Sequence, residues 1–199
     1  MLARASLFVA LALSAPVLAE EIACDGVFAI DSSEARLIEA YGAGNVVTGV
    51  VPGPEGSEML ATTVFPDEPE RSLQFTWWDE EALSDPGYIE LPPKAVSPGG
   101  VHIGQTLAEV EALNGEPFTL LGFGWDYGGS AGFETGALSN LAGGCHLNLL
   151  FDPNVYPPDV DTLPTQGDVA LSSDDPLLAR MDVRVYAMSI GYPHPDLRD

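Results

Sequence analysis

One serine lies in a pattern that nucleophilic catalysis uses. Ser130 has a glycine two residues away on each side, as in the Gly-x-Ser-x-Gly turn that presents the serine of many hydrolases. His194 follows in the chain order of a Ser-Asp-His triad, with several aspartates in residues 152–182 between them. The motif also needs a helix after the serine, and residues 133–136 do not favour one. We therefore expect a glycine-rich turn here, with a small serine hydrolase as an alternative function.

The residues that bind metals best are scattered along the chain. The three histidines lack the short spacings that place two imidazoles on one metal: His102, His146 and His194. Oxygen ligands suited to Ca²⁺ do cluster: Asp152, Asn154, Asp159 and Asp161. However, an EF-hand loop that began at Asp159 would have Pro164 where it needs glycine. A calcium-stabilised structural protein is a second alternative, and we predict no resident metal or cofactor.

Aromatic residues alternate with glycine and aspartate in residues 122–129, which makes this segment the strongest candidate for a binding site. On an extended strand, Phe123, Trp125 and Tyr127 would share one face, and Asp126 would lie on the other with glycines. Large rings with a polar tip are favoured on surfaces that recognise proteins or sugars. The alternative is that these rings fill the core.

Two adjacent tryptophans in residues 72–78 allow the same argument. Alternation places Trp77 on one face with other apolar residues and Trp78 on the opposite face, which predicts a buried Trp77 and an exposed Trp78. The predicted binding residues are Trp78, Trp125, Asp126 and Tyr127.

The first nineteen residues have the features of a secretory signal peptide. Arg4 precedes a short apolar run over residues 7–13, and small or apolar residues lead to Ala19, after which we expect cleavage. The run is too short to span a bilayer about 30 Å thick, and no later segment is long enough. The sequence therefore predicts a soluble protein of the periplasm or the extracellular space.

Two cysteines remain after cleavage, and an oxidising compartment favours a disulfide between them. A bridge between Cys24 and Cys145 would close a loop of about 121 residues, for which the chain-entropy relation gives an upper value of about 5 kcal/mol. A lipid anchor on Cys24 is the alternative, but the charged Glu21 lies three residues before it, where a lipid-anchor signal has an apolar residue. We therefore predict a disulfide that tethers the mature N-terminus.

Acidic residues outnumber basic ones by thirty to seven, and loss of Arg4 with the signal peptide takes the net charge from −23 to near −24. This charge repels phosphate backbones and anionic lipids over a Debye length of about 8 to 10 Å, so nucleic acid is excluded as a partner. A solvated acidic surface that keeps the protein soluble accounts for the charge, and a basic protein is a candidate partner.

Proline and glycine divide the chain into short segments rich in Val, Leu, Thr and aromatic residues, which predicts a β-dominated fold. The expected strands are residues 45–51, 59–65, 72–78, 118–123, 146–151 and 183–192. Two short helices are expected where Ser33 and Thr106 can cap the first free amides and where Gly42 and Gly115 can end the helix.

The two predicted helices are offset by 73 residues, and the elements after them match in outline. An internal duplication explains this offset economically, and chance is the alternative, because short capped helices are common. We therefore predict an α+β fold of two related modules, each a short helix with antiparallel strands. The modules would span residues 20–91 and 101–199, with residues 92–100 as the joint and residues 152–176 as a long acidic loop.

The start of the second predicted module resembles a known kind of module. Gly104, Thr106 and Val110, leading to Gly115, fit the Gly-x-Thr-x-x-x-Val opening of the tandem modules of the β-lactamase inhibitor protein and of small outer-membrane assembly lipoproteins. The inhibitor modules hold a disulfide inside each copy, whereas the bridge predicted here spans both. The resemblance implies a protein-binding scaffold without catalysis. We therefore expect a secreted, non-enzymatic binding or inhibitor-type protein whose partner is a protein or a glycan.

Overall fold

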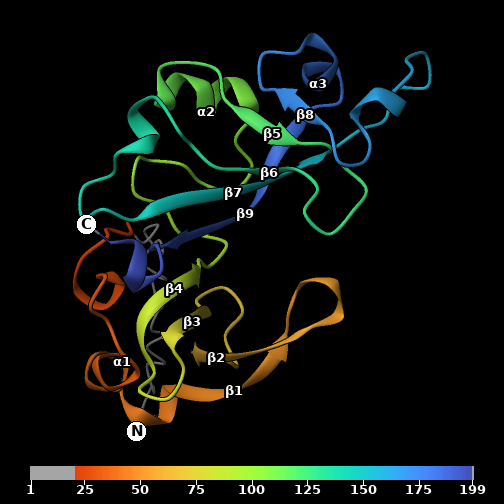
Figure 1. Cartoon of the computed structure of the whole chain (residues 1–199). Helices are drawn as coiled ribbons and strands as arrows, with labels where there is room; N and C mark the ends of the chain where they lie inside the picture. The colour runs from red at the N-terminus through yellow and green to blue at the C-terminus, as the bar shows by residue number, and fades with distance from the viewer. Residues whose placement is uncertain (1–20, 199) are drawn as a thin grey trace, which may run out of the picture.

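The computed structural model describes residues 21–198, and the predicted signal peptide lies outside them. The fold is α+β and dominated by strands (Figure 1). None of the helices within the described residues has the length and apolar character needed to cross a membrane.

The elements follow the chain in the order that Figure 1 labels. The α-helices are α1 (Glu34–Tyr41), α2 (Leu107–Asn114) and α3 (Pro176–Arg180). The strands are β1 (Val46–Pro52), β2 (Glu58–Val64), β3 (Leu73–Asp79), β4 (Ser84–Glu90), β5 (Thr119–Leu121), β6 (Ser130–Ala131), β7 (His146–Pro153), β8 (Ala170–Ser172) and β9 (Val183–Gly191). Short 3-10 turns lie at Gly26–Phe28, Ala43–Asn45, Pro54–Gly56, Ala137–Ser139, Leu163–Thr165 and Pro195–Leu197.

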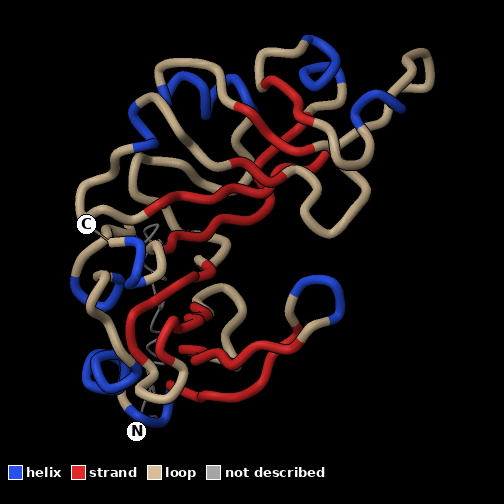
Figure 2. The backbone as a smooth tube through the Cα atoms, in the orientation of Figure 1, coloured by secondary structure: helices blue, strands red, loops and turns tan. Residues whose placement is uncertain are grey.

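Most of the strands form one antiparallel sheet in the order β1-β2-β3-β4-β9-β7-β6, and β5 pairs with β8 beside it. The chain therefore builds one half of the sheet from β1 to β4 and the other half from β9, β7 and β6. The sheet curves so that its two ends approach each other on the right of Figures 1 and 2, with α1 and α2 on its outer side.

Both predicted helices are confirmed, and local capping sets where they begin. The hydroxyl of Ser33 accepts a hydrogen bond from the amide of Arg36. Thr106 accepts one from the amide of Glu109, whose carboxylate accepts in return from the Thr106 amide at 2.8 Å. Each helix ends at the residue before the glycine that the sequence indicated.

All six predicted strands are present, each within two residues of its expected bounds. Strand β4 was not predicted, because Pro86 and Gly87 interrupt the strand pattern. Strands β6 and β8 are too short to leave a pattern. The prediction of an irregular loop over residues 152–176 was wrong in part, since this stretch includes the end of β7 and all of β8, which pairs with β5.

Alternation along the strands decides which face of the sheet forms the core. One row of directly paired residues is at most 2% exposed: Phe75 in β3, Ile89 in β4, Ile190 in β9 and Leu147 in β7. Trp77 is buried on this face as predicted, and its indole N–H donates to the hydroxyl of Thr62 at 2.9 Å. The residues between these positions point to the opposite face.

The two halves of the sheet are joined by only three residue pairs between β4 and β9. The pairs are Tyr88 with Gly191, Ile89 with Ile190, and Glu90 with Ser189. The two strands approach so closely that a Cβ atom on Gly191 would collide with the carbonyl oxygen of Gly87. Within the predicted joint, residues 92–100, Ala95 and Ser97 are buried, and the carbonyl of Val96 accepts a hydrogen bond from the Ile22 amide at 2.8 Å.

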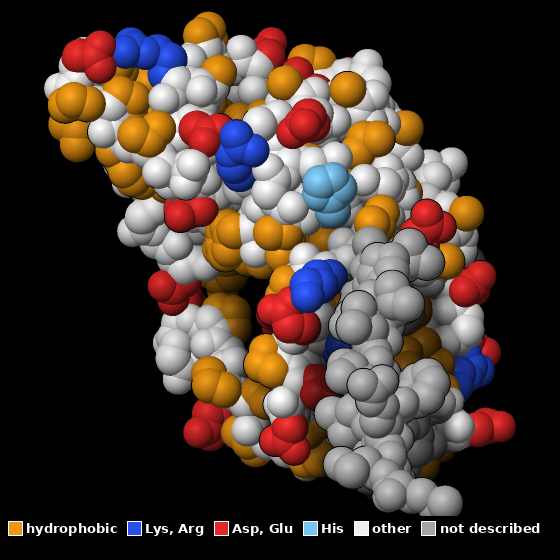
Figure 3. Space-filling model, turned by 180° about the vertical axis from the view of Figure 1, so that it is seen from behind, with side chains coloured by type: hydrophobic (Ala, Val, Ile, Leu, Met, Phe, Trp, Pro, Cys, Tyr) orange, Lys and Arg blue, Asp and Glu red, His pale blue; other side chains and the backbone are white. Residues whose placement is uncertain are grey.

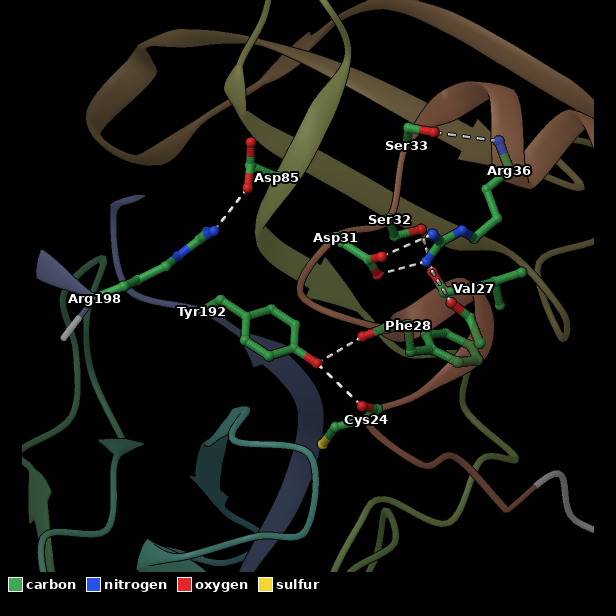
Figure 4. Close-up of polar contacts among 11 residues, drawn as sticks. Cys24, Val27, Phe28, Asp31, Ser32, Ser33, Arg36, Asp85, Tyr192 and Arg198 are labelled. Carbon is green, nitrogen blue, oxygen red and sulfur yellow. Dashed lines mark hydrogen bonds and ion pairs between the residues drawn. The ribbon is translucent and has the colours of Figure 1, made fainter. Parts of the chain in front are cut away.

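Further contacts tie the N-terminal segment to the second half of the sheet. Cys24 is disulfide-bonded to Cys145, with Cα atoms 5.9 Å apart. The hydroxyl of Tyr192 donates to the carbonyl of Phe28 at 2.8 Å and lies 3.4 Å from the carbonyl oxygen of Cys24 (Figure 4). These bonds fix residues 24–28 against the end of β9.

The helices α1 and α2 meet the sheet through the same backbone contact. The carbonyl of Ser32 accepts from the amide of Asp85 at 3.1 Å, and the carbonyl of Gln105 accepts from the amide of Val185 at 2.9 Å. The cap residue that follows each acceptor forms an isolated antiparallel bridge with the same strand: Ser33 with Ser84, and Thr106 with Arg184. The halves differ in topology: β1 to β4 are consecutive neighbours in the main sheet, whereas in the second half β5 pairs with β8 outside that sheet, and β8 and α3 stand between β7 and β9. The two-module prediction is therefore not confirmed.

The disulfide can be checked by titrating thiols in the mature protein, denatured without reductant. We expect no free thiol, because Cys24 and Cys145 are bonded to each other. Reduction should lower the free energy of unfolding by up to about 5 kcal/mol. Two reactive thiols in the unreduced protein would contradict the pairing.

Replacing Tyr192 with phenylalanine should lower the free energy of unfolding by about 1–2 kcal/mol, because the carbonyl of Phe28 loses its donor. Burial raises the pKa of Tyr192 to about 12, above its ordinary value of 10.0. The neutral hydroxyl therefore stabilises the fold fully below about pH 10, and this contribution is lost as the pH rises toward 12. Chemical denaturation at about pH 8 and about pH 11 should show a decline in stability that Tyr192→Phe reduces.

The matched control is Tyr156→Phe, because the Tyr156 ring is exposed on a loop. A wild-type decline that persists unchanged in Tyr192→Phe would show that other groups cause it.

Candidate functional site

One face of the main sheet carries none of the helices of residues 21–198, and this face is the candidate site. Cross-strand pairing places its residues in two rows that cross six strands. The first row is Gly49, Ala61, Thr76, Tyr88, Gly191 and His146. The second row is Val47, Thr63, Gln74, Glu90, Ser189 and Asn148. We call this surface the open face.

A β-bulge adds one tyrosine to the open face. Leu150 pairs with Ala187, but its neighbour Phe151 pairs with Val185, so that Tyr186 is the extra residue in β9. Regular alternation from the buried Ile190 would have placed Tyr186 in the core. Because of the bulge, Tyr186 is instead 49% exposed.

Tyr88 stands on the floor of the open face between the two halves of the sheet. Its side chain is 36% exposed, yet burial raises its pKa. A hydrogen bond with Ser189 lowers the pKa of Tyr88, whereas the negative charge of Glu90 raises this pKa further. Burial, with a smaller effect from Asp152, also raises the pKa of Tyr186. Both phenols are therefore protonated and neutral at physiological pH.

A cavity of about 330 Å³, which we call the Tyr186 pocket, opens beside the tyrosine. Its sheet side is formed by Gln74, Glu90, Tyr186 and Ala187. Its other walls include Pro66 and Pro69 between β2 and β3, and Pro92 and Pro93 of the predicted joint. Lys94, which follows these prolines, pairs with Glu70 at 2.8 Å. Glu90 forms no ion pair among the described residues, so its carboxylate is the uncompensated charge of the pocket.

The two ends of the sheet are connected across the open face. The amide of Glu55, in the turn between β1 and β2, donates to the carboxylate of Asp126 at 2.9 Å. Asp126 lies in the loop that precedes β6, the strand at the other end of the sheet. We call this hydrogen bond the clasp. Seen from behind, the surface is hollowed between the upper and lower parts of the molecule, at the left of Figure 3.

The predicted aromatic strand over residues 122–129 is a turn, so the expected alternation was wrong. Phe123 is buried, whereas Trp125 and Tyr127 are 36% and 40% exposed and their rings meet edge to face at 5.4 Å. Gly129 enforces the turn, because its φ is +73° and a Cβ atom would collide with the carbonyl oxygen of Phe151. These two rings therefore lie partly exposed on the loop that carries the clasp.

Trp78 is exposed as predicted, at 44%, but it lies apart from Trp125. Its indole N–H donates to the carbonyl of Tyr192 at 2.9 Å, just past the end of β9, and its ring contacts His194. The loop of Trp125 is instead bonded to Phe151 of β7, whose amide donates to the carbonyl of Gly129 at 2.9 Å. Phe151 pairs with Val185, near the start of β9. Six residues of extended strand span about 20 Å. The structure therefore splits the predicted binding residues into two places.

Ser130 does not have the geometry of a catalytic nucleophile. It begins β6 opposite Leu150, and no helix follows directly. Among the described residues its hydroxyl has no hydrogen bond to a histidine: His146 is about 13 Å further along β7, and His194 lies against a tryptophan. Ser130, His146 and Asn148 instead line a wide cavity of about 780 Å³ at the end of the open face.

Three of the four candidate calcium ligands, Asn154, Asp159 and Asp161, are engaged by neighbouring groups. Asp159 pairs with Arg180 at 2.8 Å, and hydrogen bonding from this guanidinium lowers the pKa of Asp159. Asp161 accepts from the amide of Leu163, while Asn154 donates to another aspartate. Within residues 21–198, His, Cys, Asp and Glu side chains form no group of three or more that could hold a metal ion.

Sequence reasoning selected no residue of the two rows as a binding residue, so its omissions include Tyr88 and Glu90, and it also missed Tyr186. Tyr88 and Glu90 lie in β4, which was not predicted because Pro86 and Gly87 interrupt the strand pattern. Tyr186 lies in a strand that was predicted, but only the bulge turns it outward. The available signal was the pattern Tyr-x-Glu, separated by one leucine from the prolines of the joint, and this pattern is too common to identify a site.

Comparisons with known proteins give no family for the chain. No protein-family model, no curated protein and no solved structure matches it. The resemblance to the β-lactamase inhibitor protein and to assembly lipoproteins therefore stays a prediction.

Replacing Asp126 with alanine should open the clasp without unfolding the protein. The bond is a single exposed one, so we expect a change in the free energy of unfolding of less than about 1 kcal/mol. Hydrogen exchange of the Glu55 amide, followed by NMR, should become faster because this amide loses its acceptor. Asp67→Ala, at an exposed position between β2 and β3, is the control. Equal exchange rates at Glu55 in the wild type and in Asp126→Ala would argue against the clasp.

Proposed function

We propose that this protein is a secreted binding protein that docks a partner protein with a basic surface onto its open face. The observation that carries the proposal is the open face itself: two rows of residues across six strands, of which Ala61, Ser189 and Gly191 are buried, with none of the described helices covering the others. At a strand spacing of about 4.8 Å, the rows extend over about 24 Å. This width suits part of a folded protein better than one sugar ring.

The charge of the molecule supports a basic partner. The two rows hold one carboxylate, that of Glu90, and no lysine or arginine. The clasp adds the carboxylate of Asp126 at the rim, and the whole chain has a net charge of −23. Complementary charge speeds encounter and disfavours acidic partners. Aromatic rings such as Tyr88 and Tyr186 supply contact area at the centre of the face.

The arrangement of the chain supports two related modules, as the sequence predicts. The cap of each helix bridges to the last sheet strand of its own half, and these two strands, β4 and β9, pair at the centre. A duplicated module that joined its copy through these strands would give a sheet twice as wide as either copy alone. The disulfide and the predicted signal peptide support a location in the periplasm or outside the cell.

Site-specific photo-crosslinking in the producing cells tests the docking face. A benzophenone amino acid is placed at Thr76 or His146 on the open face, and at the exposed Glu39 of α1 or Ala108 of α2 as controls. We expect one protein adduct shared by both open-face positions and absent from both helix positions. The purified adduct partner should bind the mature protein more weakly as the salt concentration rises.

Two outcomes would overturn the proposal. Adducts that form equally from α1 and α2 would show that the open face is not the docking surface. An adduct that carries carbohydrate and is removed by glycosidase would identify a glycan partner instead.

A further inference from the structure

We propose that the Tyr186 pocket receives one cationic side chain, a lysine or an arginine, from the docked partner. The choice of a protein side chain rests on the proposed function, whereas the preference for a cation rests on the pocket itself. The residues that would recognise the cation are Glu90, Tyr186 and, beside them on the floor of the open face, Tyr88.

The size and shape of the pocket fit a single side chain. Its volume of about 330 Å³ is at the lower end of the range of about 300–1,000 Å³ that ligand sites occupy. Prolines form much of the wall that faces the sheet, and proline has no backbone N–H to offer a ligand. The aliphatic stem of a lysine or arginine can pack along such apolar walls while its charged end reaches polar groups.

The charged end would find a carboxylate and an aromatic ring. Glu90 lines the pocket, and it has no ion pair within the part of the chain that the structure describes. Lys94, which follows the proline wall, is held by Glu70 instead. The half-exposed ring of Tyr186 lies in the same pocket, and aromatic rings attract cations. Glu90 is exposed at the mouth of the pocket, and a hydrogen bond between a carboxylate and a cation is stronger than one between neutral groups.

The same residues disfavour other ligands. An anion would meet Glu90 and the net negative charge of the chain. A sugar ring needs donors and acceptors on several sides, but prolines and other apolar residues make up most of the lining, and the neutral polar side chains are those of Gln74, Ser72 and Tyr186. The bulge supports a role in binding, because it moves the Tyr186 ring from the core side of β9 to the open face.

NMR titration of the isotope-labelled mature protein tests the pocket with defined probes. The cationic probes are the N-acetyl methylamides of lysine and arginine, and the norleucine analogue is their neutral control. We expect the cationic probes alone to shift the amides around Glu90 and Tyr186, with millimolar dissociation constants that rise with salt. Methyl glucoside tests the sugar alternative.

Three variants test the roles of the side chains. Glu90→Gln and Tyr186→Ala should each weaken binding of the lysine probe by at least about fivefold, while Tyr186→Phe keeps the ring and should bind as the wild type does. Glu39→Gln on α1 removes a carboxylate outside the pocket and should change nothing. Spectra of each variant that match the wild type away from the pocket show that the fold is kept.

The proposal is overturned if the cationic probes cause no localised shifts, if norleucine or methyl glucoside binds as tightly, or if Glu39→Gln weakens binding as much as Glu90→Gln. The titration tests the pocket and the crosslinking tests the docking face, so that failure of one proposal can be distinguished from failure of the other. Conversely, if the cationic probes bind but the open face gives no crosslinks, the proposed cation pocket stands and the proposed partner protein is ruled out.

Discussion

The pairing of β4 with β9 is the constraint on which the rest of the structure depends. Three residue pairs join β4 to β9, including Ile89 with Ile190 at the centre of the core, and backbone hydrogen bonds from Leu91 to Met188 and from Tyr192 to Gly87 flank them. So short a contact is a weak link in a seven-stranded sheet, and the chain reinforces it from outside. The disulfide from Cys24 and the hydroxyl of Tyr192 both hold the N-terminal segment against the second half.

The curvature of the sheet sets the shape of the open face. Helices α1 and α2 pack on the outer side, so burial of apolar residues is satisfied on one face alone. On the other face the ends of the sheet come near enough for Glu55 and Asp126 to form the clasp. The same curvature places the exposed rings of Tyr88 and Tyr186 at the centre of the open face and the exposed carboxylate of Asp126 at its rim. The surface combines polar side chains with partly exposed aromatic rings, which is the composition that the proposed docking requires.

Polar contacts inside the first half also fix where α1 sits. The carboxylate of Glu34 accepts from the hydroxyl of Thr48, which shares a hydrogen bond with Thr62, and Thr62 accepts from the indole of Trp77. This chain of bonds links the helix to three strands. Buried polar groups satisfied in this way favour one arrangement of the elements, because a shift of one residue along any strand would leave several of them without partners.

The sequence by itself determined the α+β class, the limits of both main helices and the positions of six strands, because capping and alternation act between residues that are close in the chain. It also indicated Trp77 as core and Trp78 as exposed. Only the tertiary structure decided which residues form the open face, since that depends on register between strands that are distant in sequence. Three features depend on such long-range contacts: the unpredicted strand β4, the bulge at Tyr186 and the separation of Trp78 from Trp125. Cross-strand contacts, unlike caps, leave no local pattern, because each strand's partner is chosen by how the whole sheet packs.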